Sequence, residues 1–243
     1  PKVSRKVMGS GGVENIVPNH QQDQEVTFLR DIFVNSIYEI TKLIEGQKII
    51  KKSNLNLEDL IHHGISTQNE ILLGKISKIL TYLTDRSEVK QKVEDILAGK
   101  DPELKLIFVA FVTDEPAFSD LLDNDQLIQV ALNIVKANKN VEHIFGATKF
   151  LSGLALLSSK SIGVLQGGGQ LDPFFALLER KDSPLMSLEV INLLRNCIKT
   201  SGESFCKTLE SYQFVQKVSS HYSGMTKALE EFVVLALTTE KAL

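Results

Sequence analysis

Hydrophobic residues recur along most of the chain at the spacing of helices. Between Asn69 and Leu83, six apolar residues fall on one face of a helix, while Lys75 and Lys78 lie opposite. The six are Ile71, Leu72, Ile76, Ile79, Leu80 and Leu83. The preceding stretch Ser66–Gln68 offers hydroxyl groups to the free N–H groups of the first turn, so it predicts the N-terminal cap.

The same periodicity predicts a helix from Phe28 to Leu43 that buries part of its apolar face. The residues expected to be buried are Phe33, Ile37, Ile40 and Leu43. Further helices are predicted over 89–97, 104–112 and 186–198. No Asn-Gly or Asp-Gly pair joins two alternating runs, so hairpins are not indicated, and the chain is predicted to be all-α.

The apolar pattern repeats when the chain is shifted by 43 residues against itself. The matched positions include Ile128, Leu171 and Phe214, then Leu132, Phe175 and Val218, and then the pairs Phe150 with Leu193 and Leu151 with Leu194. A helical period of about 40 to 47 residues is typical of HEAT and armadillo repeats, in which neighbouring units share a continuous core. The clearest units are predicted over about 115–157, 158–200 and 201–243.

The domain organisation follows from this repeat. We expect one helical-repeat domain over 23–243, in which the first part, 23–112, is helical but has no assigned register. Residues 1–22 are rich in glycine and polar side chains and show no helical stripe. They are predicted to be a flexible or peripheral segment.

One stretch carries a family resemblance. The sequence GGGQLDPFFALLERKDSPLMSLEVINLLRNCI, within 167–198, resembles an armadillo repeat. Gly169 matches the turn between the first and second helices, Pro173 and Pro184 match the starts of the second and third, and Asn196 matches an asparagine that armadillo third helices often carry. The resemblance implies a right-handed α-solenoid of armadillo/HEAT-like repeats.

The resemblance also implies a binding surface. Third helices lie side by side along a concave face that binds an extended peptide or a helix of another protein. In armadillo proteins an asparagine fixes the ligand backbone and tryptophans form side-chain pockets. This chain contains no tryptophan, which argues against a groove like that of nuclear import receptors.

Eight residues are candidates for this concave face because they fall on the exposed side of predicted third helices. They are Lys149, Ser152, Gly153, Asn192, Arg195, Asn196, Glu231 and Leu235. The alternative interpretation is that Asn196 only caps or solvates a helix.

Composition and charge narrow the classes of partner and compartment. The formal net charge of −3 provides no strongly basic field for nucleic acid, and no apolar run reaches the length of about 18 residues that spans a membrane. The start of the sequence lacks the apolar core of a signal peptide. Two cysteines are too few for a disulfide scaffold, so a cytoplasmic or nuclear protein is expected.

Candidate chemistry is sparse. Gly167–Gly169 lacks both the lysine of a phosphate-binding P-loop and the strand of a dinucleotide-binding loop, so a turn between helices is predicted. The adjacent His62 and His63 point about 100° apart on a helix, which does not favour a shared metal. Cys197 and Cys206 are predicted to be buried small hydrophobic residues. We therefore expect no catalytic residue, no cofactor and no metal.

These observations predict a non-catalytic interaction scaffold or adaptor. Two alternatives rest on fold analogy alone: a nucleotide exchange factor for an Hsp70-type ATPase, and a regulatory subunit of a kinase or GTPase pathway such as a formin-like GTPase-binding region.

Overall fold

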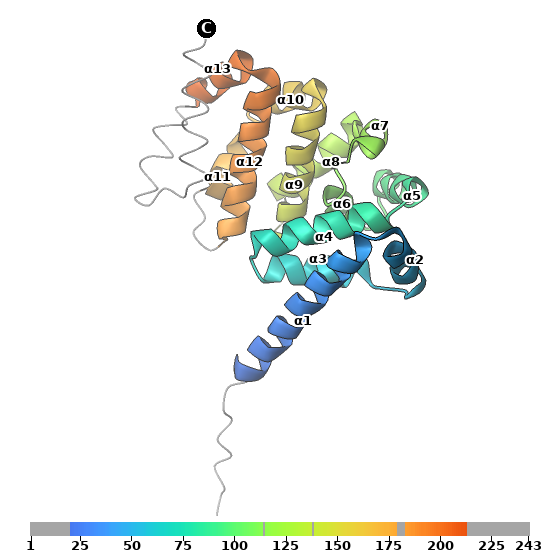
Figure 1. The fold of residues 1–243 in the computed structure, drawn as a ribbon. Coiled ribbons are helices and arrows are strands. Elements are labelled where there is room, and N and C mark those ends of the chain that lie inside the picture. Colours follow the sequence, from blue (N-terminus) through green and yellow to red (C-terminus); the bar gives the residue numbers. More distant parts are fainter. Residues whose placement is uncertain (1–19, 114, 138, 179–182, 213–243) are drawn as a thin grey trace, which may run out of the picture.

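The computed structural model describes residues 20–113, 115–137, 139–178 and 183–212, which contain helices and no strand (Figure 1). The prediction of an all-α chain is therefore confirmed for these residues. The helices are α1 His20–Thr41, α2 Ile44–Lys52, α3 Leu57–Ser66, α4 Glu70–Leu83, α5 Arg86–Leu97, α6 Pro102–Ala110, the 3-10 helix η1 Pro116–Phe118, α7 Ser119–Leu122, α8 Asp125–Ala137, α9 Val141–Leu157, α10 Ser159–Gln166, α11 Asp172–Leu178, α12 Pro184–Ser201 and α13 Glu203–Ser211.

The helices can be compared with the 43-residue repeat. Helices η1 to α9 occupy 116–157 and α10 to α12 occupy 159–201, and the assignment of 115–157 and 158–200 as repeat units stays a prediction. Ile128 and Leu171, one repeat apart, both have an exposed fraction of 0%. Helix α13 begins the third predicted unit, whose matched position Phe214 lies outside the described residues. Of the predicted flexible or peripheral segment 1–22, residues 1–19 lie outside the described residues, so the character of this segment stays a prediction.

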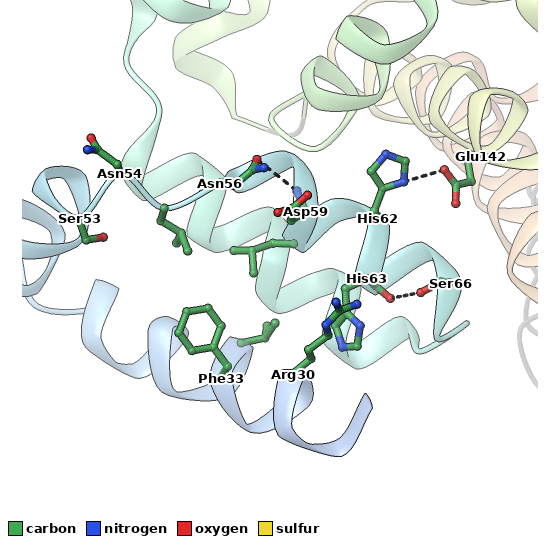
Figure 2. Close-up of a pocket in the computed structure, with 13 residues that line it drawn as sticks. Arg30, Phe33, Ser53, Asn54, Asn56, Asp59, His62, His63, Ser66 and Glu142 are labelled. Atoms are coloured by element: carbon green, nitrogen blue, oxygen red, sulfur yellow. Dashed lines mark hydrogen bonds and ion pairs between the residues drawn. The ribbon is translucent and has the colours of Figure 1, made fainter. Parts of the chain in front are cut away.

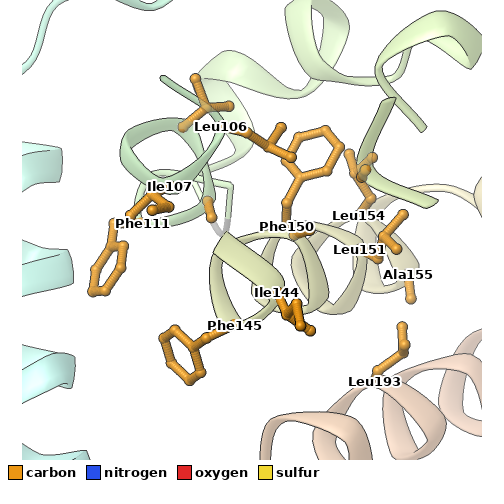
Figure 3. Close-up of a cluster of buried hydrophobic side chains, with 14 of the residues drawn as sticks. Leu106, Ile107, Phe111, Ile144, Phe145, Phe150, Leu151, Leu154, Ala155 and Leu193 are labelled. Atoms are coloured by element: carbon orange, nitrogen blue, oxygen red, sulfur yellow. The ribbon is translucent and has the colours of Figure 1, made fainter. Parts of the chain in front are cut away.

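The core is built where α6, α9 and α12 lie side by side, and α9 makes the most extensive contacts with both neighbours. Figure 3 shows the apolar side chains that fill this layer, among them Ile107 of α6, Phe150 of α9 and Leu193 of α12. The backbones of α6 and α9 approach closely at Gly146, where an added Cβ would lie 2.5 Å from Ile107 Cγ1. Because this space is filled, the position requires glycine.

The N-terminal helices turn across one end of this layer. Figure 1 shows α4 crossing the starts of α9 and α12, with α1 packed against it. Two contacts hold the crossing in place. His62 Nδ1 of α3 lies 2.8 Å from a carboxylate oxygen of Glu142 in the first turn of α9, and Leu185 N of α12 donates to Gln68 Oε1 at 3.4 Å.

The cap of α4 differs from the prediction. Asn69, rather than Ser66–Gln68, precedes the helix, and its side-chain oxygen accepts from Leu72 N at 3.1 Å. The Ser66 and Thr67 hydroxyls instead donate to carbonyls at the end of α3. The hydroxyls serve the preceding helix because the connection between α3 and α4 is so short that both ends compete for the same polar residues.

The predicted burial of α1 was wrong for three residues. Ile37 is buried as expected, but Phe33, Ile40 and Leu43 are exposed, with exposed fractions of 47%, 39% and 66%. Helix α1 packs along α4 on one side, and the described residues leave its outer apolar side uncovered. Ile71 of α4, also expected in the core, is 75% exposed because it faces away from α3.

The glycine cluster forms the predicted turn. It connects α10 to α11, and Gly168 and Gly169 have φ values of +32° and +80°. Backbone hydrogen bonds from Gly167 N to Val164 O and from Gln170 N to Gly167 O close the turn. Pro184 occupies the start of α12, also as predicted.

Candidate functional site

The candidate site is the surface of α9 and α12, the two third helices that the armadillo resemblance identifies. Six of the eight candidates are described: Lys149, Ser152 and Gly153 on α9, and Asn192, Arg195 and Asn196 on α12. Glu231 and Leu235 lie outside the described residues. Ser152, Gly153 and Asn196 are buried rather than exposed, because α9 and α12 pack against each other there. We call the face that carries the six described candidates the α9–α12 surface.

Three hydrogen bonds fix the register of these helices. Asn196 Nδ2 donates to Ser152 O at 3.0 Å and to Ser152 Oγ at 3.2 Å, and both residues are buried. One turn further, Thr200 Oγ1 donates to Ala155 O at 2.7 Å. The helices therefore run parallel with an offset close to one repeat, which places Lys149 and Asn192 at the same height.

Asn196 thus holds α12 to α9. Its exposed fraction is 8%, and its amide nitrogen is engaged with Ser152. Asn192, one helical turn earlier, is half-buried and more accessible to a partner. The alternative interpretation, that Asn196 caps or solvates a helix, does not describe this contact, because the amide reaches across to a neighbouring helix.

Lys149 of α9 connects the α9–α12 surface to α6 and, through Phe111, to α4. Its Nζ lies 5.3 Å from the centroid of the Phe111 ring, which follows the last turn of α6. Phe111 O accepts a hydrogen bond of 2.5 Å from Ser77 Oγ of α4. A cation above a desolvated aromatic ring contributes about 1 to 2 kcal/mol, so this contact orients the ammonium group as well as stabilising the packing.

Charge is distributed unevenly over the row of helices α4, α6, α9 and α12. Glu70, Glu103 and Glu142 stand in the first turns of α4, α6 and α9, where negative charge favours the helix dipole. Basic residues stand further along; they are Lys75 and Lys78 on α4, Lys105 on α6, Lys149 on α9, and Arg195 and Lys199 on α12. Lys105 is paired with Asp95 at 3.6 Å, so the positive charge of these helices is carried mainly by the other five residues.

Arg195 has unused donor capacity. Its side chain is half-buried, and its Nε is buried without a hydrogen-bond partner in the described part of the chain. Leaving a buried donor unpaired costs about 1 to 3 kcal/mol, so this group lowers the stability of the α9–α12 packing.

Sequence reasoning missed a pocket of about 690 Å³ between α1, α3 and the connection from α2 to α3 (Figure 2). His63 Nε2 pairs with Asp31 Oδ1 at 2.7 Å beside it, and Phe33 lines its apolar side. The contributing residues come from α1, α3 and the start of α9, which are distant in sequence. No local motif marks such a site.

The histidines and cysteines do not form a metal or catalytic site in the described residues. His62 and His63 point to different carboxylates, and no cluster of three metal-ligating side chains occurs in these ranges. Cys197 and Cys206 are buried as predicted, and burial raises the pKa of the Cys197 thiol well above its ordinary value. No helix of the described residues has the length and apolar content for a membrane crossing.

Comparison with known proteins identifies the class of fold. The structure is similar to a designed armadillo repeat protein in complex with the peptide (KR)4, with a TM-score of 0.50 and 15% sequence identity. The match covers 92% of this chain and 95% of the designed protein. The chain therefore has an armadillo-like fold, as the sequence resemblance implied. No protein-family model matches the sequence, and no curated protein matches it significantly.

Proposed function

We propose that the chain is a non-catalytic interaction scaffold that binds a segment of a partner protein on the α9–α12 surface. Helical-repeat folds of this kind present their third helices as extended binding faces. The observation that carries the proposal is the parallel register of α9 and α12, set by the bonds from Asn196 and Thr200. This register lines up partly exposed polar side chains from two repeats.

Each candidate residue has a distinct role in this proposal. Lys149 and Arg195 provide positive charge and hydrogen-bond donors, and Asn192 provides an amide at the height of Lys149. Asn196 and Ser152 position the two helices and need not touch the partner. Glu231 stays a prediction for the following unit. The ligand is an extended peptide or a helix of another protein, and the two free thiols favour the cytoplasm or nucleus.

Differential capture tests the proposal. Wild type is compared with the double variant Lys149→Glu and Asn192→Ala, which alters the surface and spares the Asn196 contact. The matched control is Lys139→Glu and Asn133→Ala, because both residues are exposed and lie outside α9 and α12. Each bait must first show the same circular dichroism spectrum and a cooperative urea transition, because loss of the contact between Lys149 and Phe111 can lower the midpoint of the variant.

We expect the wild type and the control to capture the same partner protein from cell extract. The variant should capture about tenfold less of that protein, which is the effect of losing a contact residue at the centre of an interface. An unchanged set of captured proteins would remove the assignment of this surface. The identity of the protein then separates a passive scaffold from the other candidate roles, since an Hsp70-type ATPase domain or a nucleotide-loaded GTPase can be assayed directly.

A further inference from the structure

Three lysine ammonium groups surround one tyrosine ring where α1 packs against α4. The Nζ atoms of Lys42, Lys75 and Lys78 lie 4.4, 5.8 and 6.0 Å from the centroid of the Tyr38 ring. Lys42 directly follows α1 and the other two lysines come from α4, so the packing of these helices creates the group. We call these four residues the lysine cluster.

The lysine cluster has little compensating negative charge. Glu39 pairs with Lys42 at 2.7 Å, and Lys75 donates to the neutral side chain of Asn35 at 2.5 Å. Within the described ranges, neither Lys75 nor Lys78 forms an ion pair with a carboxylate. The positive charge of Lys75 and Lys78 is therefore not neutralised by a paired carboxylate, so a bound anion is favoured beside them.

The surroundings of the lysine cluster are open and partly apolar. Lys78 is exposed, and a Cβ added at Gly74 would meet no atom within 4 Å. Ile71 and Tyr82 continue the exposed face of α4 on either side, with exposed fractions of 75% and 38%. A peptide strand therefore has space to lie along α4, with apolar contacts on both sides of the charges.

We propose that the lysine cluster binds an acidic segment of a partner protein, rich in Asp and Glu. Charge complementarity selects an anionic ligand, and the exposed apolar side chain of Ile71 beside the charges favours a peptide as that ligand. A lysine ammonium group is a compact point charge that pairs with single anionic oxygens, whereas a guanidinium group binds carboxylate and phosphate alike through two parallel hydrogen bonds. Arginine is absent from the lysine cluster as the structure describes it. The site is separate from the α9–α12 surface and does not depend on the function proposed there.

Fluorescence anisotropy with a labelled eight-residue peptide of alternating Asp and Glu tests the inference on the full chain. We expect binding to the wild type that weakens as salt is raised, because exposed charge pairs are screened within about 10 Å at 0.1 M. The variant Lys75→Glu with Lys78→Glu should bind about tenfold or more weakly, since each reversal replaces an attraction with a repulsion. Lys78→Glu alone keeps the hydrogen bond from Lys75 to Asn35 and should still weaken binding about threefold or more.

Matched variants separate binding at the lysine cluster from a general effect of net charge. Lys51→Glu with Lys52→Glu makes the same change in net charge on exposed residues of α2, and should retain binding. The α9–α12 variant, Lys149→Glu with Asn192→Ala, should also retain it. If that variant loses the peptide while Lys75→Glu with Lys78→Glu does not, the lysine cluster is excluded and the α9–α12 surface stands.

Two probes test the chemistry of the ligand. A labelled (KR)4 peptide, of opposite charge, should not bind, and an eight-nucleotide thymidine strand should bind more weakly than the acidic peptide. Equal binding of the thymidine strand would overturn the inference in favour of a general polyanion surface. Failure of the acidic peptide to bind the wild type at low salt would also overturn it.

Discussion

Asn196 of α12 donates from its side-chain nitrogen to both oxygens of Ser152 of α9, the backbone oxygen at 3.0 Å and the hydroxyl at 3.2 Å. The two residues are separated by 44 positions, close to one repeat, and both are buried. Because a buried amide must be hydrogen-bonded to avoid a desolvation cost, this contact specifies one register between the helices.

Replacing Asn196 should therefore affect stability before it affects binding. We expect Asn196→Ala to lower the free energy of unfolding by about 1 to 3 kcal/mol, because a buried hydrogen-bonded group is lost. Asn192→Ala, at a half-buried position of the same helix, should cost about 0.5 kcal/mol or less. Urea denaturation measures both. Equal costs for the two variants would show that the contact with Ser152 adds nothing.

The position of Asn196 could be predicted from the sequence, but its partner could not. The armadillo-like motif and the 43-residue repeat located the residue on a third helix. Its contact with Ser152 depends on the rotation and offset of α12 relative to α9, which arise from packing of the whole layer. The same limit applies to the pocket beside His63, whose walls come from three separate helices.

Burial on α1 shows a second limit of sequence reasoning. Periodicity identifies an apolar face, but it does not reveal whether another element covers that face. Helix α1 is packed on one side by α4, so Ile37 is buried while Phe33 and Ile40 remain exposed. Helices α9 and α12, by contrast, have neighbours on more than one side, and their predicted apolar positions Phe150 and Leu193 are buried.

The glycine turn makes a prediction about backbone strain. Gly169 has φ of +80°, and an added Cβ would lie 3.0 Å from Asp172 Oδ2. We expect Gly169→Ala to destabilise the fold by about 1 to 2 kcal/mol, because this backbone region is unfavourable for other residues. Gly163 of α10, where an added Cβ would meet no atom within 4 Å, is the control, and Gly163→Ala should be neutral or stabilising. Thermal unfolding of the two variants measures this difference. Equal midpoints would contradict the assignment of backbone strain to Gly169.

Burial of Cys197 predicts a loss of stability at alkaline pH. The pKa of this thiol is raised above its ordinary value of 9.0, with desolvation as the main cause. The folded thiol therefore stays neutral where the unfolded thiol ionises, so the stabilisation is present below pH 9 and is lost as the pH rises above it.

Urea titrations at pH 8 and pH 10 measure this difference. Wild type should lose about 1 kcal/mol more unfolding free energy between the two pH values than Cys197→Ala, since one pH unit corresponds to about 1.4 kcal/mol for one proton. The comparison cancels the cost of the cavity that Cys197→Ala leaves at either pH. Equal losses would mean that the thiol is ionised in the folded protein.

A double-mutant cycle at Gly146 and Ile107 tests most directly the central claim that neighbouring helices of the armadillo-like array, here α6 and α9, pack backbone against side chain. Gly146→Ala alone should destabilise by about 1 to 3 kcal/mol, because its Cβ would lie 2.5 Å from Ile107 Cγ1. Ile107→Ala removes that atom and costs about 2 to 5 kcal/mol by itself. Gly74→Ala, on the open face of α4, is the control and should be neutral or stabilising. The double variant should be more stable than the sum of the single effects by about 1 kcal/mol or more; additive effects would contradict the packing of α6 on α9.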